Sequence, residues 1–200
     1  SLGDRPGDFN TPNFISLDPP EHDGQRMAVT GVVAPTNLAA LETVIRERAA
    51  KILDGLPVGE TFNWDDKVSI ELTTQMLAAI FDFPFEDRRK LTYWSDLATS
   101  TVATGGSMPE ESRREGLMEC LEVFTQLKRE RESRDPAKHN DLVTMMAHSP
   151  ATKDMDPMEY LGNLILLIVG GNDTTRNSIS GGVLALNQFP EEYDKLRANP

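Results

Sequence analysis

The sequence predicts an all-α fold over its 200 residues. Apolar side chains recur at three- and four-residue steps in one segment after another, which is the spacing of a helix with one buried face. Glycine and proline separate these segments, as they do at helix ends. No segment alternates apolar and polar residues in the way that a half-buried strand does, so no sheet is expected.

The chain is expected to begin with a loop, because residues 1–17 are rich in Gly, Pro, Asn and Asp. The apolar side chains expected to anchor this loop are Phe9, Phe14 and Ile15. A helix then runs from Asp18 to about Val33. Its opening Asp-Pro-Pro-Glu provides a capping side chain, prolines that a first turn tolerates and an acid at the positive end of the helix dipole.

Apolar periodicity predicts four more helices in the middle of the chain, over residues 38–53, 62–83, 86–102 and 109–134. Gly55 and Pro84 stop the first two, and the Gly-Gly pair at 105–106 stops the third. The last three helices are expected over residues 141–147, 156–189 and from 190 onward.

Composition limits the function before any motif is considered. A formal net charge of −12 argues against nucleic acid as a partner, because phosphate binding needs clustered Lys and Arg. The longest apolar run, residues 164–169, is far too short to span a bilayer, so no membrane span is expected. A single cysteine excludes an internal disulfide and fits a cytoplasmic location.

The two ends of the sequence are typical of a cut chain. The sequence starts with Ser1 rather than Met, and it stops at Pro200 directly after a helical segment. We therefore expect an internal fragment of a longer protein.

Several polar or reactive residues have simple structural explanations. Cys120 lies on the apolar side of its predicted helix, and no cationic neighbour activates it, so a packed thiol is expected. His139 and His148 lie in polar connections and are expected to be solvated. The histidines show no paired spacing of the kind that holds a metal ion.

The helix predicted over 156–189 contains an anomaly. It is apolar until Val169 and then continues as Gly-Gly-Asn-Asp-Thr-Thr at 170–175. Glycine inside a helix costs about 1 kcal/mol relative to alanine, and Asp and Thr are poor helix formers. A buried helix that accepts such residues in one turn indicates a functional requirement.

A second feature is the pair His22 and Arg26 in the helix that begins at Asp18. Residues four apart share one face of a helix, so the two side chains can grip one anion together. An exposed surface pair is the simpler interpretation of this spacing taken alone.

Together these two motifs resemble the cytochrome P-450 monooxygenases. Residues 170–175 are similar to the family's oxygen-activating helix, and residues 18–26 to its haem-propionate helix. Both stand in the family's order with the expected helices between them, and the resemblance covers essentially the whole chain. The residues of both motifs resemble those of bacterial enzymes that hydroxylate the terminal carbon of medium-chain alkanes.

The resemblance implies a set of roles. His22 and Arg26 would neutralise the propionates of haem b, iron protoporphyrin IX. Gly170 and Gly171 would leave room for the macrocycle and oxygen, and their turn can loosen the helix and hold water. Thr174 would donate a hydrogen bond at the oxygen site, and Asp173 would relay protons.

Leu166 and Val169, two turns and one turn before these residues respectively, would face the substrate, with core packing as their equal alternative. The implied partners are O2, a small hydrophobic substrate, a ferredoxin and its NAD(P)H-dependent reductase. A narrow apolar channel is expected, because an alkane offers no polar handle.

The sequence departs from the family in one respect. The family's haem-ligating cysteine lies in a Phe- and Gly-rich loop after the oxygen helix, and no such loop is present. The family's later Glu-x-x-Arg helix is also absent, since Glu86–Arg89 and Glu111–Arg114 match that spacing but precede the oxygen helix. We therefore expect residues 1–200 to be a partial cytochrome P-450 domain without metal ligand or activity of its own.

Three alternatives remain open. A cytochrome P-450 could act on a fatty acid or a terpene instead. An all-α terpene cyclase would use Asn172-Asp173 as a magnesium motif, but Arg176 and Ser180 stand where that motif has Ser and Glu. A non-catalytic helical binding module would require the glycine and hydroxyl cluster to be accidental.

Overall fold

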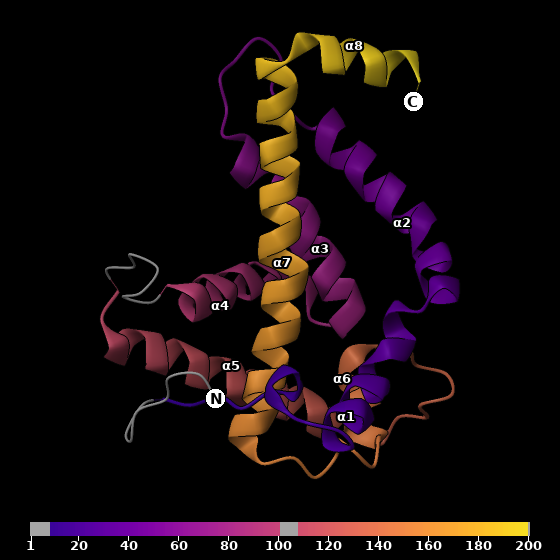
Figure 1. Cartoon of the computed structure of the whole chain (residues 1–200), viewed down its shortest axis with the longest axis vertical. Coiled ribbons are helices and arrows are strands. Elements are labelled where there is room, and N and C mark those ends of the chain that lie inside the picture. The colour runs from indigo at the N-terminus through magenta and orange to yellow at the C-terminus, as the bar shows by residue number, and fades with distance from the viewer. Residues whose placement is uncertain (1–8, 101–107, 200) are drawn as a thin grey trace.

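The computed structural model describes residues 9–100 and 108–199, and within these ranges it contains helices and no strands, as predicted. A 32-residue helix, α7, forms the axis of the molecule. Helices α3, α4 and α5 pack against it, and α8 turns away from its C-terminal end (Figure 1). The α-helices are α1 (Glu21–Thr30), α2 (Pro35–Asp54), α3 (Ile70–Phe81), α4 (Arg89–Thr99), α5 (Glu110–Arg131), α6 (Leu142–His148), α7 (Pro157–Gln188) and α8 (Pro190–Ala198).

Side-chain caps begin two of the helices. Asp141 accepts a hydrogen bond from the amide of Thr144 at 2.8 Å, and Asp156 accepts one from the amide of Met158 at 2.9 Å. Both bonds satisfy amide groups that a helix leaves free in its first turn. The predicted cap by Asp18 is wrong, because the residue before α1 is Pro20 and no side chain caps that helix.

Other predictions at the level of single residues were corrected. Ile15 is 65% exposed, so its predicted anchoring role is wrong. The predicted anchor Phe14 is buried, in a short 3-10 turn over Phe14–Ser16. His148 is half-buried at the end of α6, where its ring bonds to the carbonyl of Arg131 at 3.0 Å. The predicted end of the fourth helix at Gly105–Gly106 lies outside the described residues.

The core is aromatic where α3, α4 and α5 meet. Phe124 of α5 lies 5.4 Å from Phe81, 5.5 Å from Phe83 and 5.9 Å from Trp94, measured between ring centroids. These separations are those of favourable edge and offset contacts. The fully buried side chains of Leu161, Leu164 and Ile168 extend this core along α7.

The connection into α3 is a π-helical turn over Asp65–Ser69, which the sequence did not reveal. Ser69 is fully buried there, and its hydroxyl lies 2.8 Å from the hydroxyl of Ser180 on α7. Ser180 in turn donates to Asp65 at 2.8 Å. The wider turn therefore brings two polar groups from the start of α3 onto α7.

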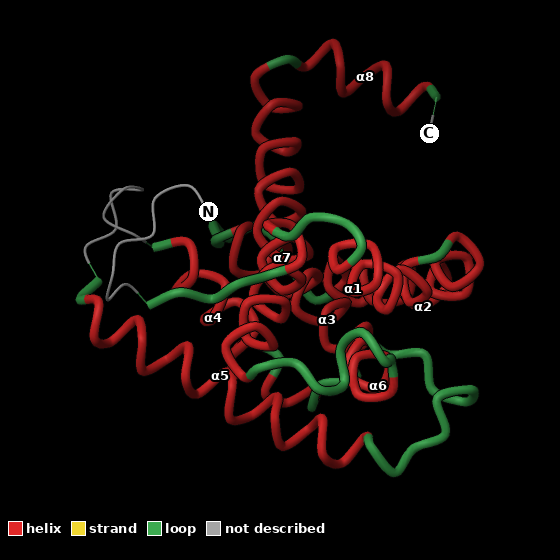
Figure 2. The backbone as a smooth tube through the Cα atoms, turned by 60° about the horizontal axis from the view of Figure 1, so that its bottom comes forward, coloured by secondary structure: helices red, strands yellow, loops and turns green. Residues whose placement is uncertain are grey.

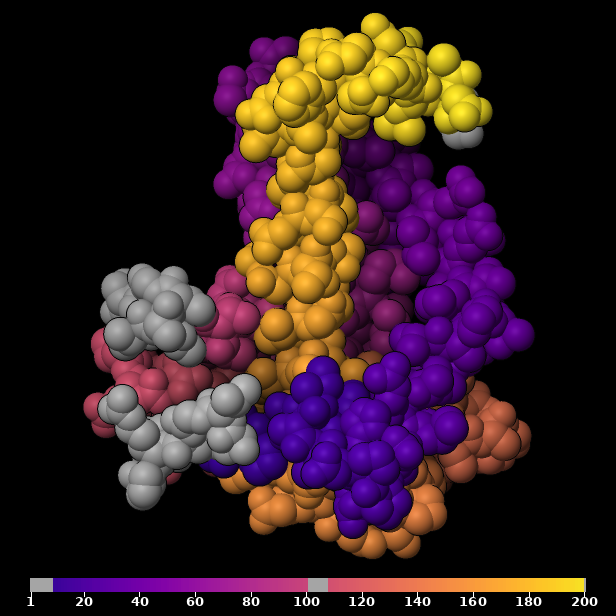
Figure 3. All heavy atoms as spheres, in the orientation of Figure 1, coloured from indigo at the N-terminus to yellow at the C-terminus, as the bar shows by residue number. Residues whose placement is uncertain are grey.

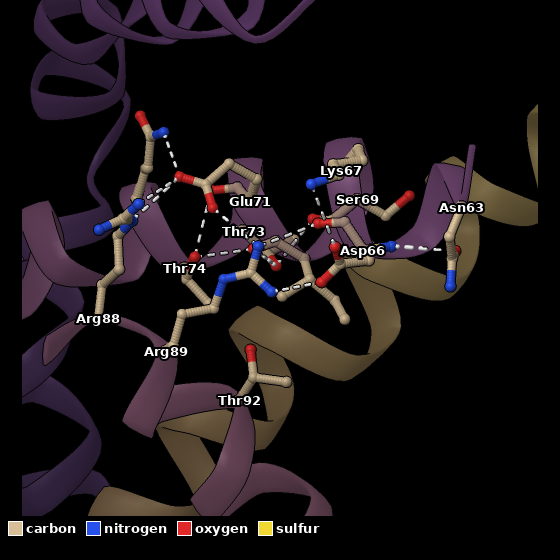
Figure 4. Close-up of polar contacts among 12 residues, drawn as sticks. Asn63, Asp66, Lys67, Ser69, Glu71, Thr73, Thr74, Arg88, Arg89 and Thr92 are labelled. Atoms are coloured by element: carbon tan, nitrogen blue, oxygen red, sulfur yellow. Dashed lines mark hydrogen bonds and ion pairs between the residues drawn. The ribbon is translucent and has the colours of Figure 1, made fainter. Parts of the chain in front are cut away.

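An ion-pair cluster joins α3 to α4 (Figure 4). Glu71 accepts hydrogen bonds from Arg88 at 2.7 and 3.0 Å and from Arg89 at 3.0 Å. Arg89 also reaches Asp66 at 2.7 Å. Burial alone would raise the pKa of Glu71, but hydrogen bonds from Gln75, Arg88 and Arg89 outweigh it and lower that pKa.

The N-terminal segment runs across α7 (Figure 2), and buried contacts fasten it there. The amide of Phe14 donates to the side chain of Asn163 at 2.9 Å, and Asn163 donates to Gln25 at 3.1 Å. A Cβ atom on Gly162 would lie 2.0 Å from the carbonyl oxygen of Pro12. Gly162 is therefore required for the close approach of two backbones.

The second half of α7 carries less packing. Figure 3 shows this helix uncovered along one face from its middle up to α8. The apolar side chains of Leu184, Phe189, Tyr193 and Leu196 are 45–59% exposed. Among the described residues no single helix is long and apolar enough to cross a membrane, although α1 with its 3-10 extension and α2, bent by 41°, pass that test as a pair.

Candidate functional site

The anomalous turn of α7 is continuous α-helix in the structure. The hydroxyl of Thr174 donates to the carbonyl of Gly170 at 2.7 Å, and the hydroxyl of Ser178 donates to the carbonyl of Thr174 at 2.8 Å. The expected loosening of the helix at this turn is therefore absent. Because its one proton is given to Gly170, Thr174 presents acceptor lone pairs outward, where the sequence predicted a donor.

The two glycines of this turn have different surroundings. A Cβ atom on Gly170 would meet nothing within 4 Å, so this backbone faces open space. A Cβ atom on Gly171 would lie 2.6 Å from Cδ2 of Leu77, which is 4% exposed in α3. Gly170 therefore leaves room for a ligand, whereas Gly171 allows α3 and α7 to pack closely.

A cavity of about 360 Å³ lies beside these glycines, between α1, α3 and α7. Its walls are mainly apolar and include Val29, Leu77, Ile80 and Leu166, with Gly170 and Gly171 on the α7 side. A volume above about 300 Å³ with apolar walls and few polar groups is typical of a small-molecule site. Val169 is half-buried and does not line this cavity, and Leu167 lines it instead.

Arg26 is the cation at the edge of this cavity. Its side chain is exposed, and no acidic side chain among the described residues pairs with it. His22 is one turn away but has another partner, because its Nδ1 lies 2.8 Å from a carboxylate oxygen of Asp23. The His22 ring also packs on Phe14, with centroids 6.3 Å apart. Arg26 therefore lines the cavity. His22 does not line it and packs against Phe14 instead.

Asp173 forms an ion pair that sequence reasoning missed. Arg176 donates from Nη2 to Asp173 at 2.7 Å and from Nη1 to Asp96 of α4 at 3.1 Å. The spacing of three residues between Asp173 and Arg176 was the available signal, since such residues share a helix face. The contribution of Asp96, 80 positions from Arg176, could not be read from the sequence.

Asn172 is the second missed residue of the turn. It is fully buried, and its side-chain oxygen accepts hydrogen bonds from Thr73 of α3 at 3.1 Å and from Thr92 of α4 at 3.2 Å. Two buried hydroxyls that meet one amide oxygen tie three helices together. The polar residues of this turn therefore have two different tasks, because Asn172 faces the core and Thr174 faces outward.

The lining of the cavity suits a haem in its polarity and in its charge. Its apolar walls suit a macrocycle, the backbone at Gly170 faces open space, and the guanidinium of Arg26, which has no acidic partner among the described residues, suits an acidic substituent at the edge. Cys120 does not offer an iron ligand, because it is fully buried and burial raises the pKa of its thiol. In the described residues, no three His, Cys, Asp or Glu side chains converge on a metal position.

Comparison with known sequences gives consistent relatives. The chain is 32% identical over 191 residues to linalool 8-monooxygenase of Pseudomonas putida, covering 94% of this chain and 46% of that protein. It is 30% identical over 179 residues to cytochrome P450 119 of Sulfolobus acidocaldarius, covering 88% and 44% respectively. No protein-family model matches the sequence. The chain spans about half the length of these relatives.

Comparison with solved structures agrees. Cytochrome P450-153 from Novosphingobium aromaticivorans superposes with a TM-score of 0.84 at 46% identity, covering 94% of this chain and 45% of that one. CYP153D17 from Sphingomonas sp. PAMC 26605 gives a TM-score of 0.87 at 44% identity, covering 100% and 49%. Helices α1 to α8 are thus arranged as in the matching part of these larger proteins, which is about half of each.

Proposed function

We propose that this chain, which belongs to the cytochrome P450 family, forms about half of a haem-dependent monooxygenase. The reaction would insert one oxygen atom of O2 into an unactivated C–H bond. The observation that carries the proposal is the apolar cavity between α1 and α7, which has Arg26 at its edge and the Gly170 turn on its wall. We call the full-length protein that would contain these 200 residues the complete enzyme.

Haem is the cofactor of this family, and it supplies the oxygen chemistry when bound. The residues of this chain would hold it and manage its surroundings. Arg26 would pair with a propionate, and the apolar walls would exclude water from the macrocycle. Gly170 would let the helix backbone approach the reacting centre, since any larger side chain would fill the open side.

Thr174 and Asp173 would manage the protons of the reaction. Thr174 has its own proton on the Gly170 carbonyl, so its oxygen can accept a hydrogen bond from a group or water on the open side. Asp173 immediately precedes Thr174 on α7. Its side chain is 27% exposed, so its carboxylate can exchange protons with solvent. Asp173 would take protons from solvent, and Thr174 would direct them to the open side of the helix beside Gly170.

The proposed substrate is a medium-chain n-alkane or a related linear chain, hydroxylated at its terminal carbon. The wording of both sequence motifs supports this class, and Leu166 on the cavity wall provides apolar contact. A second candidate is a terpene or fatty-chain substrate. The similarity to a linalool 8-monooxygenase and to a methyl-branched lipid omega-hydroxylase of Mycobacterium tuberculosis supports it.

Electrons would come from a ferredoxin and its NAD(P)H-dependent reductase, in the cytoplasm. We further propose that residues 1–200 alone are a partial domain that binds haem weakly and catalyses nothing. The reason lies in Cys120, the one cysteine of the sequence, which is fully buried and therefore unable to reach a haem in the cavity. Adding haem to the isolated 200-residue chain, reducing it and exposing it to carbon monoxide should give no thiolate-haem band.

The test of the function is a threonine comparison in the complete enzyme. Thr174→Ala should keep consuming O2 while product falls and hydrogen peroxide rises, because the acceptor beside Gly170 is lost. Thr174→Ser should restore much of the coupling, and the neighbouring exposed Thr175→Ala should behave as the wild type. The assays would measure nicotinamide, peroxide and product formed from a panel of alkanes, fatty acids and linalool. Unchanged coupling in Thr174→Ala would overturn the assigned role.

A further inference from the structure

Two polar contacts join α4 to α7 one helical turn apart. Thr92 of α4 donates to Asn172 of α7 at 3.2 Å, and four residues later on both helices Asp96 accepts from Arg176 at 3.1 Å. Residues four apart lie on the same face of a helix, so the two contacts stand in one line. The first contact is buried and the second lies at the edge of solvent.

Arg176 is shared between two carboxylates at the outer contact. Its side chain is only 15% exposed, while those of Asp173 and Asp96 are 27% and 52% exposed. The two terminal nitrogens each serve one acid, so the flat guanidinium is fixed in both direction and plane. An arginine that bonded to Asp173 alone could rotate with it, whereas Asp96 anchors this one to a different helix.

We propose that Arg176, held by Asp96 of α4, is a positioning residue that sets the direction of the Asp173 carboxylate next to Thr174. The inference rests on the proposed function, in which Asp173 moves protons. An aspartate side chain has several staggered orientations, and a charge-assisted hydrogen bond of 2.7 Å selects one. Thr174 is fixed separately by the Gly170 carbonyl, so the relative placement of acid and hydroxyl depends on Arg176.

This arrangement makes α4 part of the catalytic geometry. Asp96 does not line the cavity, and it acts through its bond to Arg176. An ion pair that served stability only would change the melting temperature of these variants without changing their coupling. The two roles are therefore separable by measuring proton delivery and stability in the same variants.

The experiment uses the complete holoenzyme and four variants, Asp173→Asn, Arg176→Gln, Arg176→Lys and Asp96→Asn. Arg176→Gln should lower the coupling of nicotinamide consumption to product about 10-fold, a part of the ~10²–10⁴-fold that a positioned acid–base group provides. Its solvent deuterium isotope effect should rise, because proton delivery becomes slower. Arg176→Lys should restore part of the coupling, and Asp96→Asn should shift it in the same direction as Arg176→Gln but less. Arg46→Gln, which removes an exposed pair with Glu42 on α2, is the matched control and should change nothing.

Haem content and melting temperature of each variant identify any that fail to fold. Asp96→Asn, at an exposed position, keeps the test usable if Arg176→Gln does not fold. If Asp173→Asn lowers coupling while Arg176→Gln and Asp96→Asn leave coupling and the isotope effect unchanged, the positioning role is overturned and the proposed function stands. If Asp173→Asn also leaves both unchanged, the proton role of Asp173 falls and this inference falls with it.

Discussion

At the scale of single residues, Gly170 and Gly171 are neighbours on α7 with different tolerances. Gly170 faces open space, whereas Gly171 leaves only the room that Leu77 needs. Helix propensity favours alanine over glycine by about 1 kcal/mol at both positions. Packing therefore determines whether alanine stabilises or destabilises each position. One matched pair of substitutions distinguishes the roles of the two glycines.

Gly170→Ala should raise the free energy of unfolding of the haem-free protein by up to about 1 kcal/mol, because alanine is the better helix former. It should also weaken haem binding, because its methyl group enters the open side. Gly171→Ala should lower the free energy of unfolding, since overpacking a filled contact costs about 1–3 kcal/mol. Urea unfolding and haem titration of the complete enzyme measure both effects. Equal changes in the two variants would contradict the different surroundings seen for the two positions.

Arg26 and His22 also have different surroundings, although they share one helix face. Arg26 lines the cavity without an acidic partner in the described part of the chain, whereas His22 bonds to Asp23. Arg26→Gln should weaken haem affinity about 10-fold, the equivalent of one charge-assisted hydrogen bond, and His22→Gln should weaken it less. Haem transfer to apomyoglobin measures the release rate, with Arg46→Gln as the control. A larger effect at His22 would show that the cavity-lining position of Arg26 is not what holds the propionate.

At the scale of elements, the first half of α7 is fixed by backbone contacts rather than by side-chain packing alone. The carbonyl of Pro12 approaches Gly162 more closely than any Cβ atom allows, and Asn163 holds the amide of Phe14. Helix α7 and the segment before α1 therefore behave as one unit. The second half of α7 has no comparable contact at Gly181, where a Cβ atom would meet nothing within 4 Å.

Gly162→Ala should destabilise the complete enzyme by about 2 kcal/mol, because two backbones must separate to admit the methyl group. Gly181→Ala on the same helix is the control and should stabilise it by up to about 1 kcal/mol. Urea unfolding measures the stability, and limited proteolysis should cut near residues 9–17 faster in Gly162→Ala only. Slow cleavage there in both variants would mean that Gly162 does not hold the segment.

At the scale of the whole molecule, packing of α3 against α4 depends on charge. Glu71 gathers Arg88 and Arg89 in the cluster of Figure 4, with its side chain 17% exposed. Because the pKa of Glu71 is lowered in the folded state, its contribution to stability is present above its ordinary value of 4.5. That contribution is lost as the pH falls through the lower folded-state pKa.

Glu71→Gln should therefore lower the free energy of unfolding by about 2 kcal/mol at neutral pH, the usual value for hydrogen bonds to a charged group. The difference from the wild type should shrink below pH 4.5 and disappear once Glu71 is protonated in both states. Urea unfolding of the complete enzyme across this range measures it, with Glu42→Gln at an exposed pair as the control. A difference that stays constant with pH would rule out ionisation of Glu71 as its cause.

The sequence predicted each α-helix that the structure describes in residues 9–100 and 108–199, because period and helix-end residues are local properties. It also identified the Gly170 to Thr175 turn, since poor helix formers stand out in an apolar helix. It missed the partners of that turn, because Asp96, Thr73 and Thr92 are brought there only by packing of α3 and α4. The π turn before α3 was missed for the same reason, as Ser69 meets Ser180 more than a hundred residues later.

The bond between Phe14 and Asn163 also has a consequence for the order of folding. It joins residues 149 positions apart, so the segment before α1 cannot dock until α7 has been synthesised. Closing so long a loop costs entropy before any contact repays it. At about 5–20 residues per second, the ribosome would leave Phe9 and Phe14 unprotected for roughly 7–30 seconds. A nascent chain of this protein therefore offers a chaperone the side chain of Phe14, which the finished protein buries.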